Sequence, residues 1–236
     1  MNEKHIVNKD RLIFAMDVPD CDQAKELTET LGDAVTFYKL GLELMMTNGY
    51  FDLMDWMLER DKKIFADLKF FDIPATVGSA VRQLKDRGAS FVTIHGNQAI
   101  MEAAAENKGD KLKVLAVTAL TSLDRGDLDD LGFDCNVEEL VLSRAKRALQ
   151  AGCDGVIASG IEAPQLRKNI DSKLLVITPG IRPVDNKPSQ DQKRVVTVTR
   201  AFENGADYIV VGRPIRDADN PRNAAEEIQA SISNCF

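Results

Sequence analysis

Short apolar runs recur along the chain, and each is followed by a stretch in which apolar residues recur at helical spacing. The runs are brief, rich in β-branched residues and closed by polar residues, Gly or Pro. Such runs are typical of buried parallel strands rather than of strands that alternate between core and solvent. The pattern predicts eight strands, at residues 12–16, 35–40, 63–68, 91–95, 114–118, 155–158, 174–178 and 208–211.

The segments between these runs carry start and stop signals for helices. Asp20 can cap a helix that ends at Gly32, because Asp accepts hydrogen bonds at helix starts and Gly tolerates the turn that ends a helix. Pro74 lies near the first turn of another helix, and Gly88 follows its end. Further helices are expected at residues 137–150 and 223–233.

Eight strands that alternate with about eight helices in 236 residues fit a (β/α)8 barrel, the TIM barrel, at the small end of its size range. No linker-like stretch interrupts the chain, so residues 1–236 are expected to form one α/β domain. A doubly wound open sheet is the alternative, but the glycine motifs of dinucleotide and phosphate loops are absent. A barrel places its chemistry at the carboxyl ends of the strands.

Composition and charge exclude several classes of protein and of binding partner. Hydrophobic residues make up 44% of the chain and charged residues 28%, as in ordinary globular proteins. The net charge of −7 argues against nucleic acid and anionic membranes as partners, although a local basic cluster could still bind a small anion. No apolar run approaches the ~18 residues of a membrane span. The four scattered cysteines are expected to be reduced thiols, so we expect a cytoplasmic protein.

Four charged residues lie inside or beside the apolar runs, at the ends of the first three strands. They are Asp17, Lys39, Asp67 and Lys69. A charge in such surroundings is costly unless it is paired, and opposite charges on converging strands indicate a functional site. Asp67 and Lys69 are two residues apart and should project to the same face of their strand. Asp72 follows in the sequence D-L-K-F-F-D.

A lysine between carboxylates stays protonated, and the carboxylates stay ionised. Such an ammonium group can donate a proton but cannot act as a Schiff-base nucleophile. The fixed negative charge of the carboxylates would also favour the departure of a substrate anion placed beside them. The residues therefore favour proton-transfer chemistry on an anionic substrate.

Two loops have the features of a phosphate site. Barrels often bind phosphate at the loops after strands 7 and 8. Here these loops read TPGIR and VGRPI, in which Gly180 and Gly212 allow a close approach and Arg182 and Arg213 supply charge. The long polar loop of residues 182–192 is expected to form a mobile lid. His95 either serves as an acid or base or is a hydrogen-bonded residue at the end of its strand.

Several segments, taken in order, resemble the orotidine 5′-monophosphate decarboxylase family from Arg11 to the last helix. They are FAMDVP, FYKLGLEL, ADLKFFDIPATV, VTIHG, LAVTALTS, TPGIRP, DQKR and YIVVGRPI. The resemblance implies a small barrel that acts as a homodimer and converts orotidine 5′-monophosphate to UMP in pyrimidine biosynthesis. It also implies that no metal and no organic cofactor takes part.

The resemblance assigns roles to the charged residues. Lys69 matches the catalytic proton donor, and Asp67 matches the carboxylate beside the leaving CO₂. Lys39 and Asp17 match residues that hold the ribose hydroxyls and complete the charge network. Asp72 matches an aspartate that reaches into the neighbouring subunit's site.

The resemblance also assigns the remaining substrate contacts. Thr121 matches the hydroxyl residue that reads the pyrimidine edge, and Thr76 lies where contacts to the ribose are made. The phosphate contacts match Arg182, Gln192, Gly212 and Arg213. Two positions depart from the family's pattern, because Ala75 stands where Asn is common and Val198 stands where Pro is common.

Two alternatives remain. Related barrels that act on sugar phosphates as decarboxylases or aldolases share the D-x-K-x-x-D motif but use Mg²⁺ and carry an acidic residue at the end of the second strand. This chain has Lys39 there. The other alternative is an inactive barrel that serves as a ligand sensor or scaffold, which should have lost a charge of the network.

Overall fold

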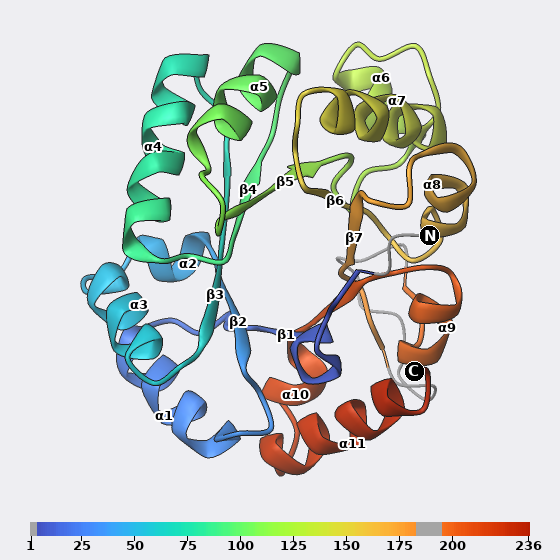
Figure 1. The fold of residues 1–236 in the computed structure, drawn as a ribbon. Helices are drawn as coiled ribbons and strands as arrows, with labels where there is room; N and C mark the ends of the chain where they lie inside the picture. Colours follow the sequence, from blue (N-terminus) through green and yellow to red (C-terminus); the bar gives the residue numbers. More distant parts are fainter. Residues whose placement is uncertain (1–3, 183–194) are drawn as a thin grey trace.

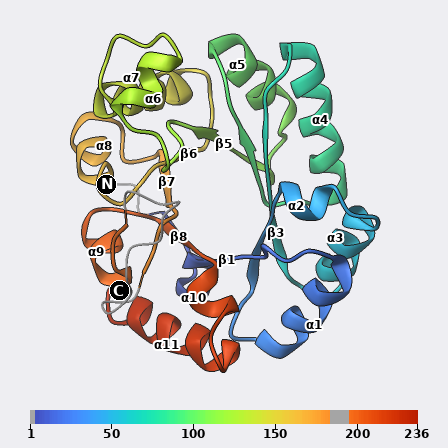
Figure 2. The ribbon, with the colours of Figure 1, turned by 180° about the vertical axis from the view of Figure 1, so that it is seen from behind.

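Eight parallel strands close into a barrel with helices around it (Figures 1 and 2). The computed structural model describes residues 4–182 and 195–236. The strands pair in sequence order, and the last pairs with the first. The predicted barrel is confirmed, and the open sheet is excluded. The strands are β1 (Leu12–Ala15), β2 (Phe37–Leu40), β3 (Lys63–Phe70), β4 (Phe91–Ile94), β5 (Lys113–Val117), β6 (Gly155–Ile157), β7 (Leu175–Thr178) and β8 (Tyr208–Val211).

The helices between the strands include the predicted ones and several shorter ones. The long helices are α1 (Cys21–Leu31), α3 (Tyr50–Leu58), α4 (Pro74–Arg87), α5 (Gln98–Asn107), α7 (Val137–Gln150) and α11 (Pro221–Ser233). The short ones are η1 (Asn8–Arg11), α2 (Leu42–Met45), α6 (Arg125–Asp130), α8 (Ala163–Asn169), α9 (Val198–Glu203) and α10 (Arg213–Arg216). Helices of four to six residues, such as α2, α6 and α10, are too short to show an apolar period, so the sequence did not predict them.

The predicted ends of α1 and α4 are confirmed, whereas α11 begins two residues before the predicted position. Asp20 caps α1, because its side chain accepts a hydrogen bond from the backbone N–H of Gln23 at 2.8 Å. Pro74 is the first residue of α4, where its missing N–H costs nothing. Gly88 ends α4 at φ 91°, a left-handed conformation that Gly adopts without strain.

The strands are buried on both faces, which explains their continuous apolar runs. One apolar layer fills the barrel, where the ring centroids of Phe37 and Phe91 are 4.8 Å apart and those of Phe91 and Tyr208 are 5.2 Å apart. A second, larger layer includes Leu12 and Phe14 together with apolar residues of the helices. Side chains therefore alternate between the barrel interior and the helices along each strand.

The same alternation carries charged residues to one end of the barrel. Ala15, Phe37 and Phe65 belong to the interior layer. The residues two positions later are Asp17, Lys39 and Asp67, so each continues an inward-facing row just beyond the apolar filling. The barrel thus brings charges from three neighbouring strands together.

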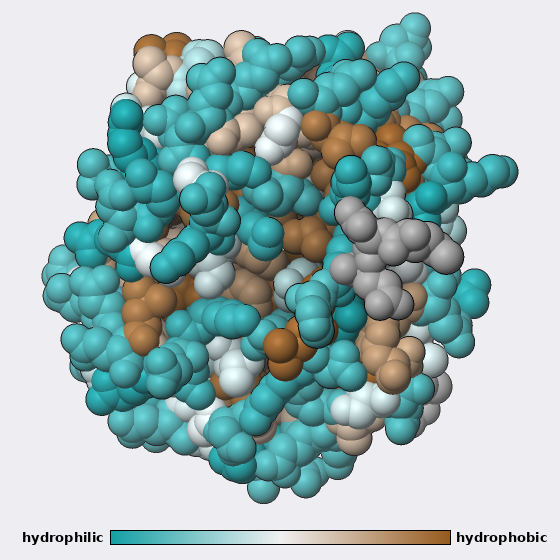
Figure 3. Space-filling view, in the orientation of Figure 1, coloured by the Kyte–Doolittle hydropathy of each residue, from teal (hydrophilic) through white to brown (hydrophobic). Residues whose placement is uncertain are grey.

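Hydrophilic and apolar residues are unevenly distributed over the face of the molecule that Figure 3 shows. A space-filling view shows hydrophilic residues over most of the helices at the periphery, with apolar residues more frequent toward the centre of that face (Figure 3). Within residues 4–182 and 195–236, no helix has the length and apolar character to span a bilayer.

Candidate active site

A cavity of about 440 Å³ lies at the carboxyl ends of the strands. Its wall contains residues from, or directly after, strands on all sides of the barrel. Eight of the residues predicted for the site line it, namely Asp17, Lys39, Asp67, Lys69, Thr121, Arg182, Gly212 and Arg213. The sequence separates these residues by nearly 200 positions, and the closure of the barrel brings them together.

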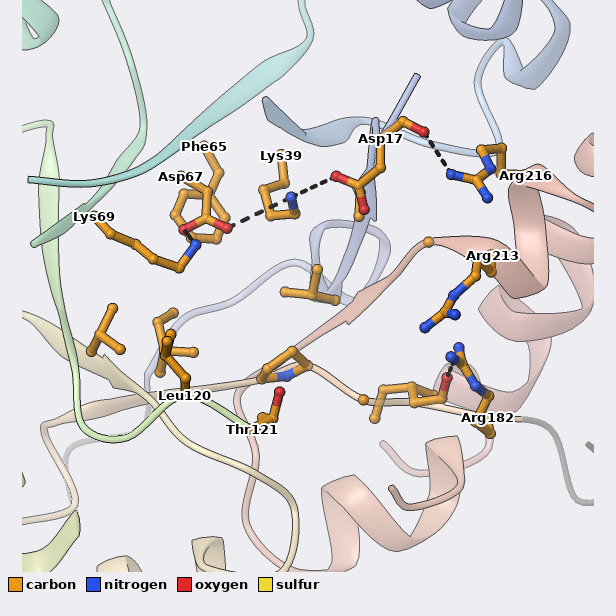
Figure 4. Close-up of a pocket in the computed structure, with 18 of the residues that line it drawn as sticks. Asp17, Lys39, Phe65, Asp67, Lys69, Leu120, Thr121, Arg182, Arg213 and Arg216 are labelled. Atoms are coloured by element: carbon orange, nitrogen blue, oxygen red, sulfur yellow. Dashed lines mark hydrogen bonds and ion pairs between the residues drawn. The ribbon is translucent and has the colours of Figure 1, made fainter. Parts of the chain in front are cut away.

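The four charged residues form a continuous chain of alternating sign along one wall (Figure 4). Lys39 Nζ lies 3.0 Å from Asp17 Oδ1 and 3.6 Å from Asp67 Oδ2. Lys69 Nζ donates a hydrogen bond to Asp67 Oδ1 at 2.9 Å. Each carboxylate oxygen of Asp67 therefore faces a different ammonium group, and Lys39 lies between two carboxylates.

The electrostatics of the central pair keep both groups charged. Burial alone would lower the pKa of Lys39, but the charges of Asp67 and Asp17 outweigh it and raise the pKa. Burial alone would raise the pKa of Asp67, but Lys39, Lys69 and a hydrogen bond from Thr93 lower it. These directions agree with the charge states predicted from the sequence for Lys39 and Asp67.

Two arginines lie at the end of the cavity away from Lys69. Arg182 follows β7 and Arg213 follows β8, and Figure 4 shows both guanidinium groups at this end. Glycine suits both neighbouring positions. Gly180 has φ 77°, in the left-handed region, and a Cβ on Gly212 would lie 3.3 Å from the Cβ of Ala15. This end of the cavity is suited to an anion.

The remaining wall is less charged. Thr121 lies across the cavity from the charged chain (Figure 4). Phe65, Val117, Ile157 and Val210 add apolar surface to the lining. The cavity therefore has a cationic end, a charged wall and an apolar part with a hydroxyl group, which suits a ligand with an anionic group at one end and a less polar part at the other.

Comparisons with known proteins agree with this arrangement. The family model described as "Orotidine 5'-phosphate decarboxylase / HUMPS family" matches residues 10–228. This chain belongs to that family. It is 64% identical over 236 residues to the orotidine 5′-phosphate decarboxylase of Methylococcus capsulatus, covering 100% of this chain and 97% of the relative. It is 48% identical to that of Stenotrophomonas maltophilia, covering 96% of this chain and 94% of the relative.

Solved structures give the same result. The crystal structure of orotidine 5′-phosphate decarboxylase from Lactobacillus acidophilus superposes with a TM-score of 0.84 at 35% identity, covering 94% of this chain and 99% of that chain. The corresponding structure from Pyrococcus horikoshii has a TM-score of 0.75 at 25% identity and the same coverage. The family membership predicted from the sequence is confirmed.

Two of the residues that the family resemblance pointed to do not line this cavity. Asp72 and Thr76 are exposed, and Asp72 Oδ1 accepts a hydrogen bond from the backbone N–H of Ile73 at 2.6 Å. Gln192 lies outside the described residues, as does the expected lid beyond Arg182. The contacts of Asp72 with the neighbouring subunit's site, of Thr76 with the ribose and of Gln192 with the phosphate stay predictions.

The two departures from the family's pattern, Ala75 and Val198, do not line the cavity, and neither does His95. Ala75 is in the first turn of α4, and Val198 is the first residue of α9. The backbone N–H of His95 donates to the carbonyl of Phe70 at 2.9 Å. Burial, together with the charges of Arg144 and Lys69, lowers the pKa of the His95 imidazole.

The sequence analysis missed two residues that touch the site. Arg216 lines the cavity, donates to the carbonyl of Asp17 at 2.6 Å and pairs with Asp217. It lies three positions after Arg213, and this spacing on a helix could have indicated a second arginine on the same side. Thr93 contacts both Asp67 and Lys69, but nothing in its local sequence separates it from an ordinary strand threonine.

Proposed function

We propose that this protein converts orotidine 5′-monophosphate to UMP, with Lys69 as the proton donor and with no metal or organic cofactor. The alternating chain Asp17–Lys39–Asp67–Lys69 carries this proposal. It places an ammonium group and a carboxylate side by side at one wall of a cavity whose far end is cationic. Membership of the family supports the same reaction.

The cavity offers a place for each part of this substrate. Its phosphate would bind Arg182 and Arg213, with the backbone at Gly212 near enough for contact and Gln192 as a further ligand. Arg is well suited to this role because its planar group can donate two parallel hydrogen bonds to phosphate. The ribose hydroxyls would contact Asp17 and Lys39. The pyrimidine edge would then face the hydroxyl of Thr121.

This placement leaves C6 of the pyrimidine and its carboxylate beside Asp67 and Lys69. The bond between C6 and the carboxylate breaks, CO₂ leaves, and the electron pair stays on C6. The Lys69 ammonium stabilises this pair and then transfers a proton to C6, which gives UMP and a neutral amine. Stabilisation comes from charges fixed before the reaction, which need no reorganisation as charge develops.

The charged chain also bears on the two alternatives. In a Mg²⁺-dependent sugar-phosphate enzyme, acidic groups at the strand ends would hold the metal ion. Here the space between Asp17 and Asp67 is filled by the ammonium group of Lys39. All four charges are in place, which argues against an inactive sensor. These observations favour the cofactor-free decarboxylase.

A direct assay tests the proposed reaction. Purified protein is mixed with orotidine 5′-monophosphate in the presence of EDTA, and the absorbance of the orotate ring is followed. We expect the band to disappear at the same rate with and without the chelator, and UMP to form in equal amount. Turnover that EDTA abolishes and Mg²⁺ restores would favour the sugar-phosphate class of mechanism.

Arg213→Ala tests the phosphate site. Loss of charge-assisted hydrogen bonds in a partly enclosed site should cost about 3 kcal/mol of transition-state stabilisation. This loss lowers kcat/KM for the nucleotide roughly a hundredfold. The same substitution should change kcat/KM for the phosphate-free nucleoside less than about threefold. Arg200→Ala is the matched control, because Arg200 is an exposed arginine of α9 that pairs with Glu203. Equal losses for both substrates would show that Arg213 does not bind the phosphate.

We further propose a homodimer in which Asp72 completes the neighbouring subunit's site. Phe71 and Ile73, on either side of Asp72, are 70% and 66% exposed. Large apolar side chains exposed together in this way support a protein contact at this loop. The cytoplasmic location stays a prediction from the sequence.

A further inference from the structure

Thr93 of β4 touches both charged residues of β3 and is completely buried. Its Oγ1 accepts a hydrogen bond from the backbone N–H of Lys69 at 3.0 Å and donates one to Asp67 Oδ1 at 2.8 Å. A hydroxyl group has one hydrogen to donate and lone pairs with which to accept. The single hydroxyl therefore joins the main chain of the proton donor to the carboxylate beside it.

The backbone of β3 explains why such a contact is needed. Ala66 pairs with Val92, and the next paired residue of β3 is Phe70, opposite Ile94. Three residues of β3 thus lie opposite Thr93 alone, and the regular ladder of backbone hydrogen bonds is broken there. Lys69 has φ 47°, a left-handed conformation that residues with a Cβ seldom adopt. Its N–H finds its acceptor in the Thr93 side chain.

The Asp67 carboxylate is held from several directions. Oδ1 receives both the Lys69 ammonium and the Thr93 hydroxyl, and Oδ2 faces Lys39. The Thr93 bond lies on the buried side of this group, whereas Lys69 is partly exposed to the cavity. Without the hydroxyl, both the carboxylate and the Lys69 backbone would lose a fixed partner.

We propose that Thr93 is a positioning residue for the decarboxylation, because its hydroxyl holds Lys69 in its left-handed backbone conformation and fixes the Asp67–Lys69 pair. The inference rests on the proposed function. Thr93 acts through these two residues and does not line the cavity. Its effect should therefore fall on the chemical step rather than on substrate binding.

Kinetics of Thr93→Val and Thr93→Ser test the role of the hydroxyl. Val keeps the branched shape and removes both hydrogen bonds, whereas Ser keeps the hydroxyl. We expect Thr93→Val to lower kcat roughly a hundredfold, the order of loss caused by a displacement of about 1 Å in a catalytic group, with KM changed less than about threefold. Thr93→Ser should stay within about fivefold of wild-type kcat.

Thr28→Val is the matched control. Thr28 of α1 is also buried but does not line the cavity, and its hydroxyl donates a hydrogen bond to the carbonyl of Ala24 in the same helix. Removing that hydroxyl should leave kcat at the wild-type value. Should Thr93→Val fail to fold, Thr93→Cys takes its place and is compared with Thr93→Ser, because the thiol that replaces the Ser hydroxyl forms only weak hydrogen bonds. An intermediate loss of kcat is then expected.

A second measurement does not depend on turnover. Hydrogen exchange of the Lys69 amide, followed by NMR, should be faster in Thr93→Val and near wild type in Thr93→Ser. Wild-type kcat in Thr93→Val, an equal loss in Thr93→Ser, or a loss confined to KM would each overturn the proposal. A wild-type protein that does not turn over orotidine 5′-monophosphate would refute the proposed function, whereas unchanged exchange of the Lys69 amide would refute the positioning contact.

Discussion

Replacing Lys69 by Ala is expected to lower kcat for orotidine 5′-monophosphate by at least about 10⁴-fold, while the barrel stays folded. The side chain supplies both the proton and the cationic charge at C6, and each contribution is typically worth 10² or more. About a third of the side chain is exposed to the cavity, so its removal leaves the apolar core unchanged. Stopped-flow absorbance and a thermal melt measure the two expectations.

Lys69→Arg separates the two contributions. Arg keeps the positive charge but holds its protons too tightly to give one up, so this variant should be nearly as inactive as Lys69→Ala. Lys85→Ala is the control, because Lys85 lies at the end of α4 and pairs with Asp86 away from the cavity. A Lys69→Arg enzyme with near-normal kcat would disprove proton donation by Lys69.

The barrel could be predicted because its strands are buried on both faces. Continuous apolar runs indicate such strands clearly, and the bounds of β8 agree with the prediction. Other bounds differ by up to two residues, because β2 begins at Phe37 rather than at residue 35 and β3 continues to Phe70 rather than ending at residue 68. Alternation within a strand predicted that Asp67 and Lys69 face the same way, and both line the cavity. These are local properties, so one sequence was enough to predict both the fold and most of the charged wall.

Contacts between strands could not be predicted in the same way. Whether Thr93 faces Asp67 depends on the register of β4 against β3, and that register changes between Ala66 and Phe70. No rule of spacing or propensity would have placed Lys69 in a left-handed conformation, because lysine does not favour it. The spacing of Arg216 from Arg213 could indicate its side of α10, but not its hydrogen bond to the carbonyl of Asp17, which follows β1 at the other end of the chain.

The sequence also could not show where Asp72 acts. The motif D-L-K-F-F-D suggests one site with three neighbouring charges, yet the structure separates them. Asp67 and Lys69 line the cavity, whereas Asp72 is exposed in the loop between β3 and α4. An exposed carboxylate between exposed apolar residues is what a subunit contact would require. The assembly therefore needs an experiment of its own.

Mixing Lys69→Ala and Asp72→Ala, each inactive alone, is expected to restore activity if subunits exchange. In a two-fold symmetric dimer the sharing is reciprocal. One site of a mixed dimer then collects both defects, and the other receives Lys69 from its own chain and Asp72 from its partner. Half of the dimers in an equimolar mixture are mixed, so the recovered activity should approach about a quarter of the wild-type value.

A mixture of Lys69→Ala with Asp67→Ala is the matched control. Both residues line the cavity of their own chain, so each site of a mixed dimer lacks one of them, and the mixture should stay inactive. The two mixtures differ only in whether the second defect lies in the barrel interior or in the exposed loop. If mass spectrometry shows mixed dimers and the Asp72 mixture remains as inactive as the Asp67 mixture, Asp72 acts within its own chain. Recovery in the Asp72 mixture alone would place a carboxylate of each subunit at its partner's Lys69, where it extends the alternation of charges by one member.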